Sequence, residues 1–175
     1  MVVSEVDRLV EPVSAQLGEC GFLRRYVRWA VTQTDAPVTF HVLTGLMGIA
    51  TTVPADAKIE MGVGTQAPNL FGMIVGESGR ARKSWSMGLV RRLLENACPD
   101  RLGLRIGAYE AAIAAVAEQP YMTIFEPEFS RFLSQAKGGA AAGYMNALKT
   151  GLTDLYDSSP ISRRTKKIRH ELKKY

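Results

Sequence analysis

The chain has 175 residues, 46% of them hydrophobic and 8% aromatic, which indicates one domain with a real core and argues against two. No apolar run approaches the ~18 residues that span a bilayer, and the acidic, amphipathic start is unlike a signal peptide, so we expect a cytoplasmic protein that does not bind membranes. The net charge of +5 resides in the last fourteen residues, which carry seven Lys or Arg and one Glu, whereas the rest of the chain is nearly neutral.

The basic C-terminal segment, residues 162–175, has two interpretations. Its clustered cations favour contact with a phosphate backbone. Alternatively, it is a solvated, frayed end of the chain. Cysteine usage is less ambiguous, because Cys20 and Cys98 have no metal-binding spacing and no disulfide framework. They indicate reduced thiols in a cytosolic protein.

Three helices are predicted at the N-terminus, over about 4–17, 21–34 and 35–53. The second has a helical stripe of apolar residues with its arginines largely off it: Phe22, Tyr26, Trp29 and Ala30 form the stripe. Asp35 is the candidate N-cap of the third helix, which is apolar enough to be buried. His41 has no second His or Cys nearby and is interpreted as a core or cap histidine.

The remainder alternates between short apolar runs and helices. A short strand is predicted at "KIEM" and turn chemistry at "VGTQAPN". The runs 70–75 and 121–125 are typical of buried parallel strands, and helices are predicted over 83–97 and 108–120. This order predicts an α/β domain with a mainly parallel sheet.

A glycine-rich segment, "GESGRARKS", links the first of these apolar runs to the next helix. It is close to the phosphate-loop pattern G-x-x-x-x-G-K-[ST], in which backbone N–H groups surround a phosphate at a helix N-terminus. Lys83 and Ser84 fill the last two positions, as the cation for the β- and γ-phosphates and the hydroxyl for Mg²⁺. The first glycine, Gly76, comes one position early, and Arg82 replaces the last glycine.

Two interpretations of this loop compete on the motif alone. In one, it is an ordinary strand-to-helix turn with Lys83 on the first helical turn. In the other, it binds a nucleoside triphosphate, and the strand before it and the helix after it are the context such a loop requires. The residues assigned to the nucleotide are then Gly76, Glu77, Ser78, Gly79, Arg80, Ala81, Arg82, Lys83 and Ser84.

Two carboxylates follow the second apolar run, in "YMTIFEPEF". An acidic strand end of this form is typical of nucleotide hydrolases, where one carboxylate holds Mg²⁺ and another orients the attacking water. Glu126 is the candidate metal-side acid, and the candidate catalytic residues are Glu128 and Lys83. The structural alternative is an acidic N-cap for a following helix, which Glu128 also suits.

With these motifs in order, the chain resembles the helicase-type, RecA-like ATPase domains of phage, plasmid and integrated-element replication proteins. The resemblance rests on "PNLFGMIVGESGRARKSWS", "EQPYMTIFEPEFSRFL" and "GLTDLYD", and covers most of residues 20–167. Such domains tolerate an arginine before the loop lysine. The resemblance implies a three-layer P-loop core that binds ATP and Mg²⁺ and acts on DNA, usually as a homo-oligomer.

The resemblance also has a departure. Such domains continue with strands that carry a polar sensor residue and an arginine finger, and this chain ends in its basic segment, where Arg163 and Arg164 match a basic pair of unassigned role. We therefore expect a helical segment over 1–55, a partial ATPase core over 56–161 and a basic tail over 162–175.

Three functions remain open from the sequence. The first is an ATPase that couples hydrolysis to DNA unwinding or translocation. The second is a non-hydrolysing remnant that binds nucleotide or nucleic acid. A third, a small-molecule kinase, is disfavoured because no lid-like arginine cluster surrounds an acceptor site.

Overall fold

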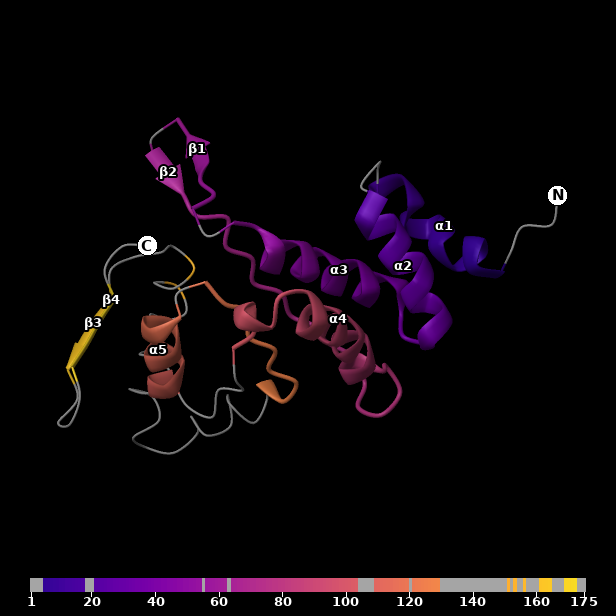
Figure 1. Cartoon of the computed structure of the whole chain (residues 1–175). Coiled ribbons are helices and arrows are strands. Elements are labelled where there is room, and N and C mark those ends of the chain that lie inside the picture. Colours follow the sequence, from indigo (N-terminus) through magenta and orange to yellow (C-terminus); the bar gives the residue numbers. More distant parts are fainter. Residues whose placement is uncertain are drawn as a thin grey trace. The chain divides into compact units, whose positions relative to one another are not determined.

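The computed structural model describes residues 5–17, 21–54, 56–62, 64–103, 109–119, 121–129, 151, 153, 156, 161–164 and 169–172. The chain divides into two compact units, which are described separately (Figure 1). The first, the helical unit, comprises Met1–Thr52 and Gly72–Pro99. The second unit comprises Val53–Phe71 and Asp100–Tyr175.

The helical unit contains α1 (Glu5–Leu17), α2 (Gly21–Gln33), α3 (Val38–Thr52) and α4 (Lys83–Ala97). All four confirm helices predicted from the sequence. The core lies where α3 packs on α2 and α4 and where α1 packs on α2. Helices α1, α2 and α4 contribute apolar side chains to it, whereas the buried face of α3 consists of His41, Thr44, Gly45, Gly48 and Thr51. The buried apolar side chains are Val10, Leu17, Leu23, Tyr26, Val27, Ala30, Ala36, Leu89, Val90 and Leu94.

Two glycines of α3 permit its close packing. A Cβ added at Gly45 would lie 2.6 Å from Leu23 Cδ1, and one added at Gly48 would lie 2.9 Å from Val90 Cγ2. Both distances are shorter than carbon atoms tolerate, so α3 packs against α2 at Gly45 and against α4 at Gly48. Gly88 on α4 differs, because an added Cβ would meet nothing within 4 Å.

This contrast predicts opposite effects for the same substitution. Gly88→Ala should raise the free energy of unfolding by about 0.5–1 kcal/mol, because alanine is the better helix former and has room. Gly48→Ala gains the same propensity but overpacks the stiff Val90 side chain, which costs about 1–3 kcal/mol, so we expect net destabilisation. Urea unfolding of both variants measures the sign, and stabilisation by Gly48→Ala would contradict the packing described.

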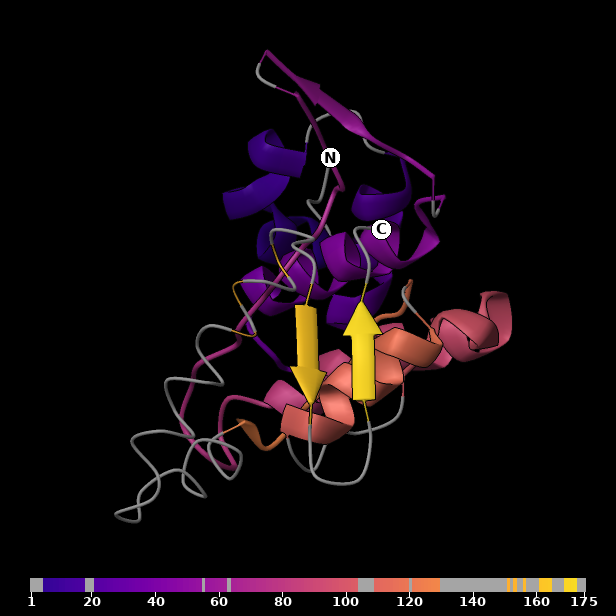
Figure 2. The ribbon, with the colours of Figure 1, turned by 90° about the vertical axis from the view of Figure 1, so that its left-hand side faces the viewer.

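The second unit contains β1 (Ile59–Met61), β2 (Gly64–Gln66), the 3₁₀ turn η1 (Pro99–Arg101, which begins at the unit boundary), α5 (Tyr109–Glu118), β3 (Ile161–Arg164) and β4 (Arg169–Leu172). Strands β1 and β2 pair antiparallel, and so do β3 and β4, whose hairpin is visible in Figure 2. The strand at "KIEM" is thus confirmed, whereas β2 lies where the sequence suggested only a turn. The pairing of β3 with β4 does not fit the interpretation of these residues as a frayed end of the chain.

A parallel backbone pairing joins the segment before α5 to the segment after it. Leu102 bridges Thr123 in parallel, with Gly103 N–H donating to Thr123 O at 3.0 Å and Thr123 N–H donating to Arg101 O at 2.8 Å. At Gly103 an added Cβ would lie 2.5 Å from Met122 Sδ and 2.8 Å from Ile124 Cγ1, so these side chains would have to shift. Parallel neighbours need a crossover, usually a helix, and α5 occupies that position in the chain.

The apolar run 70–75 is not a buried strand, and that prediction is wrong. Its residues have no strand partner in the described part of the chain. Within the helical unit, Gly72 and Gly76 lie against Leu43 and Phe40 of α3, whereas Met73 and Val75 are 62% and 77% exposed. The part of the run that belongs to the helical unit therefore has one side against α3 and the other open to solvent.

The three-layer parallel core remains a prediction. The described sheets are two antiparallel pairs, and the Leu102–Thr123 bridge is the parallel contact of the described residues. The helix expected after Glu128 lies almost wholly outside the described residues. Of the described helices, none has the length and apolar character needed to cross a membrane.

Candidate phosphate-binding loop

The glycine-rich loop belongs to the helical unit and ends where α4 begins, at Lys83. Two of its residues have left-handed backbone conformations, Gly79 with φ 78° and Arg82 with φ 51°. Glycine adopts this region freely, whereas other residues pay about 1–2 kcal/mol. Arg82 thus stands where the common pattern has glycine and also has a glycine-like conformation.

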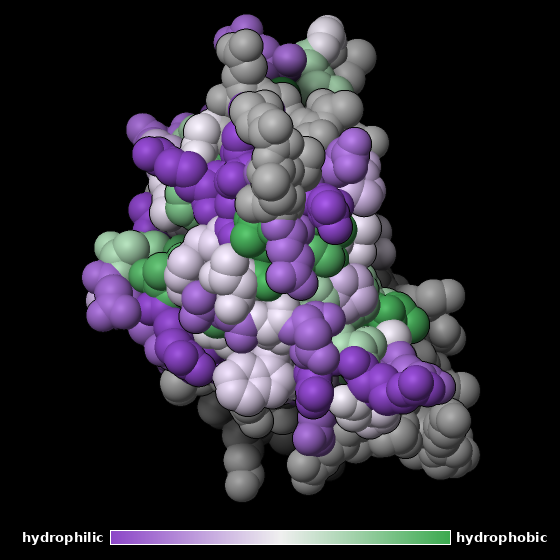
Figure 3. Space-filling view, turned by 90° about the vertical axis from the view of Figure 1, so that its right-hand side faces the viewer, coloured by the Kyte–Doolittle hydropathy of each residue, from purple (hydrophilic) through white to green (hydrophobic). Residues whose placement is uncertain are grey.

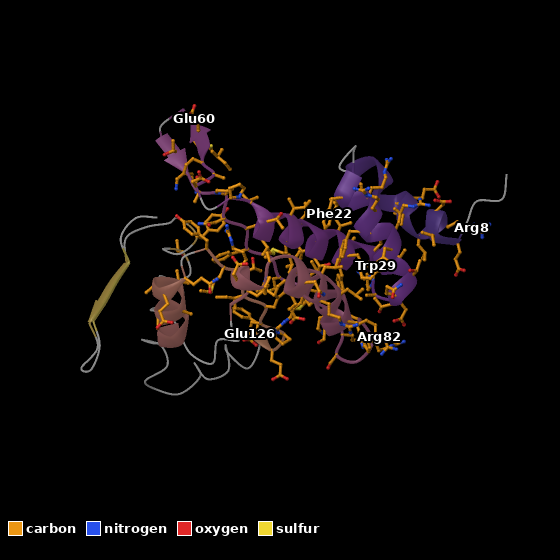
Figure 4. The ribbon with its side chains drawn as sticks, in the orientation of Figure 1. Arg8, Phe22, Trp29, Glu60, Arg82 and Glu126 are labelled. Carbon is orange, nitrogen blue, oxygen red and sulfur yellow. The ribbon has the colours of Figure 1, made fainter. Side chains whose placement is uncertain are left out.

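An ion pair accompanies the unusual conformation of Arg82. Its Nε donates to Asp35 Oδ1 at 3.0 Å, from the loop to the link between α2 and α3 (Figure 4). Asp35 is therefore not the N-cap predicted for α3, which begins three residues later at Val38. The pair is well exposed, so its contribution to stability is about 0.2–1 kcal/mol.

Two variants of Arg82 isolate the backbone effect. Arg82→Ala and Arg82→Gly both remove the ion pair with Asp35, but only glycine relaxes in the left-handed region. We expect the glycine variant to be more stable than the alanine variant by about 1 kcal/mol, measured by urea unfolding. Equal stability would mean that residue 82 does not have a positive φ in solution.

The side chain of Lys83 curls back over the loop. Its Nζ donates to the carbonyl oxygen of Gly76, and to that of Glu77 at 3.4 Å. The ammonium therefore spans the loop from its last residues to its first. An added Cβ at Gly76 would lie 2.7 Å from Ala81 Cβ, so glycine is needed for the two ends of the loop to approach this closely.

The N-terminus of α4 has the features of an anion site. Lys83 and Ser84 are its first residues, and their N–H groups are among the four that an α-helix leaves without intrahelical acceptors. Arg82 provides no side-chain cap. Ser84 is exposed beside Lys83. The helix dipole adds partial positive charge at this end.

The other loop side chains are open to solvent. Arg80 pairs with Glu77 at 3.5 Å, and both are largely exposed. Ala81 N–H donates to Glu77 O at 3.2 Å, which closes the turn that contains Ser78 and Gly79. Of the nine predicted nucleotide residues, Ala81 and Lys83 are half-buried and the other seven are exposed. Their role in binding a nucleotide remains a prediction.

The two predicted acidic residues lie in the second unit, after Phe125, which is buried. Glu126 is half-buried and its Oε1 accepts a hydrogen bond from Glu128 N–H at 3.2 Å. The helix that Glu128 would cap lies almost wholly outside the described residues, so the capping alternative stays open. The loop and the acids belong to different units, and the metal and catalytic roles of the acids stay predictions.

Two motifs that lie far apart in the sequence meet within the second unit. Asn69 Nδ2 donates to Tyr156 O at 2.7 Å, and the Phe71 ring lies edge-on to the Tyr156 ring with centroids 5.4 Å apart. The "PNLF" and "LYD" segments were singled out only for their order in the chain. Sequence reasoning did not predict that they touch.

The basic pair Arg163 and Arg164 lies on β3, and Arg164 is opposite Arg169 of β4 in the register. This places cationic residues of the basic segment together at one end of a hairpin. Within the described ranges, no three His, Cys, Asp or Glu side chains gather as a metal site.

Comparisons with known protein families, with curated proteins and with solved structures gave no match to this chain.

Proposed function

We propose that the chain is an ATP-binding P-loop domain, with an α/β core of the RecA-like type, that couples ATP hydrolysis to DNA unwinding or translocation. The observation that carries the proposal is the position of Lys83 Nζ, over the loop and against its first carbonyl oxygens. A phosphate loop needs a lysine at the helix start whose ammonium reaches across the loop, and the contacts of Lys83 support this role.

The chemistry of the loop suits a triphosphate. A phosphate group above α4 would accept from the free N–H groups at the helix start, and Lys83 would exchange its carbonyl contacts for phosphate oxygens. The exposed loop leaves the phosphates accessible. The left-handed conformations of Gly79 and Arg82 support the backbone path that turns amide groups toward an anion.

Mg²⁺ suits the oxygen donors that are available. Ser84 Oγ is exposed at the helix start, and Mg²⁺ binds through few protein oxygens while it keeps several waters. Bound Mg²⁺ would neutralise charge on the β- and γ-phosphates. We assign the metal-side carboxylate to Glu126 and the orientation of the attacking water to Glu128. A neighbouring subunit would supply an arginine to the ATPase site. The protein would act in the cytoplasm.

The alternative is a remnant that binds nucleotide or nucleic acid without hydrolysis. The hairpin β3–β4 favours it, because its register places Arg163 and Arg164 opposite His170 and Arg169, and clustered basic residues favour contact with phosphates. This function needs neither acid. The basic segment would then be the main nucleic-acid contact.

Steady-state ATP turnover, with and without single-stranded DNA, separates these functions. The ATPase proposal expects Mg-dependent turnover that rises with DNA and is abolished by Glu128→Gln, while Glu118→Gln, an exposed glutamate at the end of α5, has no effect. DNA binding that neither needs nucleotide nor produces turnover supports the remnant. Turnover unaffected by Glu128→Gln would remove the catalytic assignment.

A further inference from the structure

The apolar stripe of α2 does not bury all the residues that the sequence placed on it. The buried face consists of Leu23, Tyr26, Val27 and Ala30. Phe22 and Trp29, by contrast, are 45% and 40% exposed. Both are labelled in Figure 4. Two large rings at the edge of a packed helix are an unexpected use of aromatic surface in a chain with few aromatics.

A buried tyrosine holds the two rings in place. Tyr26 is buried, and its hydroxyl shares a hydrogen bond with Thr44 Oγ1 at 3.0 Å. Burial raises the pKa of Tyr26, so the phenol stays neutral, although the Thr44 hydrogen bond works in the opposite direction. Phe22 stacks on the Tyr26 ring and Trp29 packs on it at an angle, both with centroids 6.0 Å apart. The exposed rings are therefore pre-positioned by the core.

An arginine lies on the same side of α2 as the two rings. Residues 22, 25 and 29 are three and four positions apart, a spacing that places them on one side of a helix. Arg25 thus lies between the two rings along this side. Its Nε donates to Gly21 O at 3.0 Å, a contact made by Nε that involves neither terminal amino group.

Two of the three arginines of α2 have no acidic partner among the described residues. Helix α2 carries three arginines and no acidic residue. Arg28 pairs with Asp7 of α1. Among the described residues, no carboxylate lies within ion-pair distance of Arg24 or Arg25. Figure 3 looks at the end of the helical unit that carries α1 and α2, where pale and green side chains lie open among purple ones.

We propose that Phe22, Arg25 and Trp29, here called the α2 stripe, form a contact site for single-stranded nucleic acid. Bases stack on exposed aromatic rings, and each stacked base contributes about 1–3 kcal/mol. The arginine between the rings binds a backbone phosphate. This combination fits a flexible strand with accessible bases better than a duplex, whose bases are already stacked.

The inference rests on the proposed action on DNA, but not on the phosphate loop or on hydrolysis. It adds a position for the strand, on α2, that neither the motifs nor the basic segment indicated. It also gives the helical segment a role in the proposed function. Binding at the α2 stripe is therefore measured without nucleotide.

The test is binding of fluorescent oligo-dT of about 20 nucleotides, followed by anisotropy over a series of salt concentrations. Trp29→Ala should weaken binding about 5- to 100-fold, and Trp29→Phe should retain most of the affinity, because phenylalanine still stacks. Arg25→Gln should weaken binding and reduce the slope of log K against log salt by about 0.7, the value of one phosphate contact on a single strand.

Matched controls lie on α4, where Trp85 and Arg92 are also exposed. Trp85→Ala and Arg92→Gln should leave oligo-dT affinity within about twofold, and the circular dichroism of every variant should show the helices intact. The proposal is overturned by equal losses for Trp29→Ala and Trp85→Ala, by an unchanged salt slope for Arg25→Gln, or by preference for duplex DNA. An oligo-dT affinity that Trp29→Ala leaves unchanged overturns the α2 stripe but not the proposed function. The absence of DNA-stimulated turnover overturns only the proposed function.

Discussion

Lys83→Ala should weaken Mg·ATP binding at least tenfold, which is a loss of about 1.4 kcal/mol or more. The lysine is the side chain folded over the loop, with hydrogen bonds to the carbonyl oxygens of Gly76 and Glu77. Replacing it removes the cation that meets the phosphates, while the helix dipole and the amide groups remain. Charge-assisted hydrogen bonds are the strong ones, so a large effect is expected. Isothermal calorimetry measures it directly.

The control is Lys58→Ala, which removes an exposed lysine of the second unit. It should bind Mg·ATP as the unchanged chain does, which excludes a general effect of net charge. Circular dichroism and the urea midpoint must show that Lys83→Ala is folded. If the unchanged chain and both variants are folded and none binds, the loop is a structural turn in this chain and the ATPase proposal fails.

His41→Met should raise the free energy of unfolding, by about 1–2 kcal/mol at pH 7. His41 is wholly buried, and neither ring nitrogen has a hydrogen-bond partner among the described residues. An unsatisfied buried polar group costs about 1–3 kcal/mol. Methionine has a similar volume, adapts its shape and carries no strong hydrogen-bonding group. Urea unfolding at fixed pH measures the gain.

The gain should grow as the pH falls. Burial lowers the pKa of His41 below its ordinary value of 6.5, so the unfolded chain takes up a proton that the folded chain does not. The stability of the unchanged chain is then complete above about pH 6.5 and decreases below it, by at most about 1.4 kcal/mol per pH unit, until the folded pKa is passed. His41→Met lacks this term. A constant difference between the two proteins from pH 7.5 to 5 would show that His41 is not buried as described.

The helices and the loop could be predicted from the sequence because their determinants are local. Hydrophobic period and the glycine-rich spacing predicted α1, α2, α4 and α5 within one or two residues. The same local reasoning placed Lys83 and Ser84 at a helix start, where the structure has them. Local patterns also marked His41 as a core residue, and it is buried.

Other features depend on partners distant in the sequence. Asp35 has the composition of an N-cap, but Arg82, far along the chain, binds its carboxylate instead. The run 70–75 has strand composition, yet a strand also needs a neighbour, and composition does not say whether one is available. Phe22 and Trp29 fit the buried period of α2 and are nevertheless exposed at its edge, because the width of the buried face depends on the neighbouring helices.

The candidate site could be predicted only in part, because some of its contacts are local and others join residues far apart in the sequence. Its loop is a continuous segment, so its geometry follows from nine neighbouring residues. The roles of Glu126 and Glu128 depend on long-range placement, and their local hydrogen bond could be found only in the structure. The contact of Asn69 and Phe71 with Tyr156 likewise has no local sequence pattern that would reveal it.

The chain has two tryptophans, Trp29 and Trp85, and both belong to the helical unit, on α2 and α4. Intrinsic emission excited at the red edge of protein absorption therefore comes from this unit alone. Far-ultraviolet ellipticity, in contrast, includes α5 of the second unit as well. Recording both signals during one denaturant titration would reveal whether the two units unfold in a single cooperative step, because coincident transitions are the mark of two-state behaviour. The emission of the two tryptophans thus reports on the folding of the helical unit.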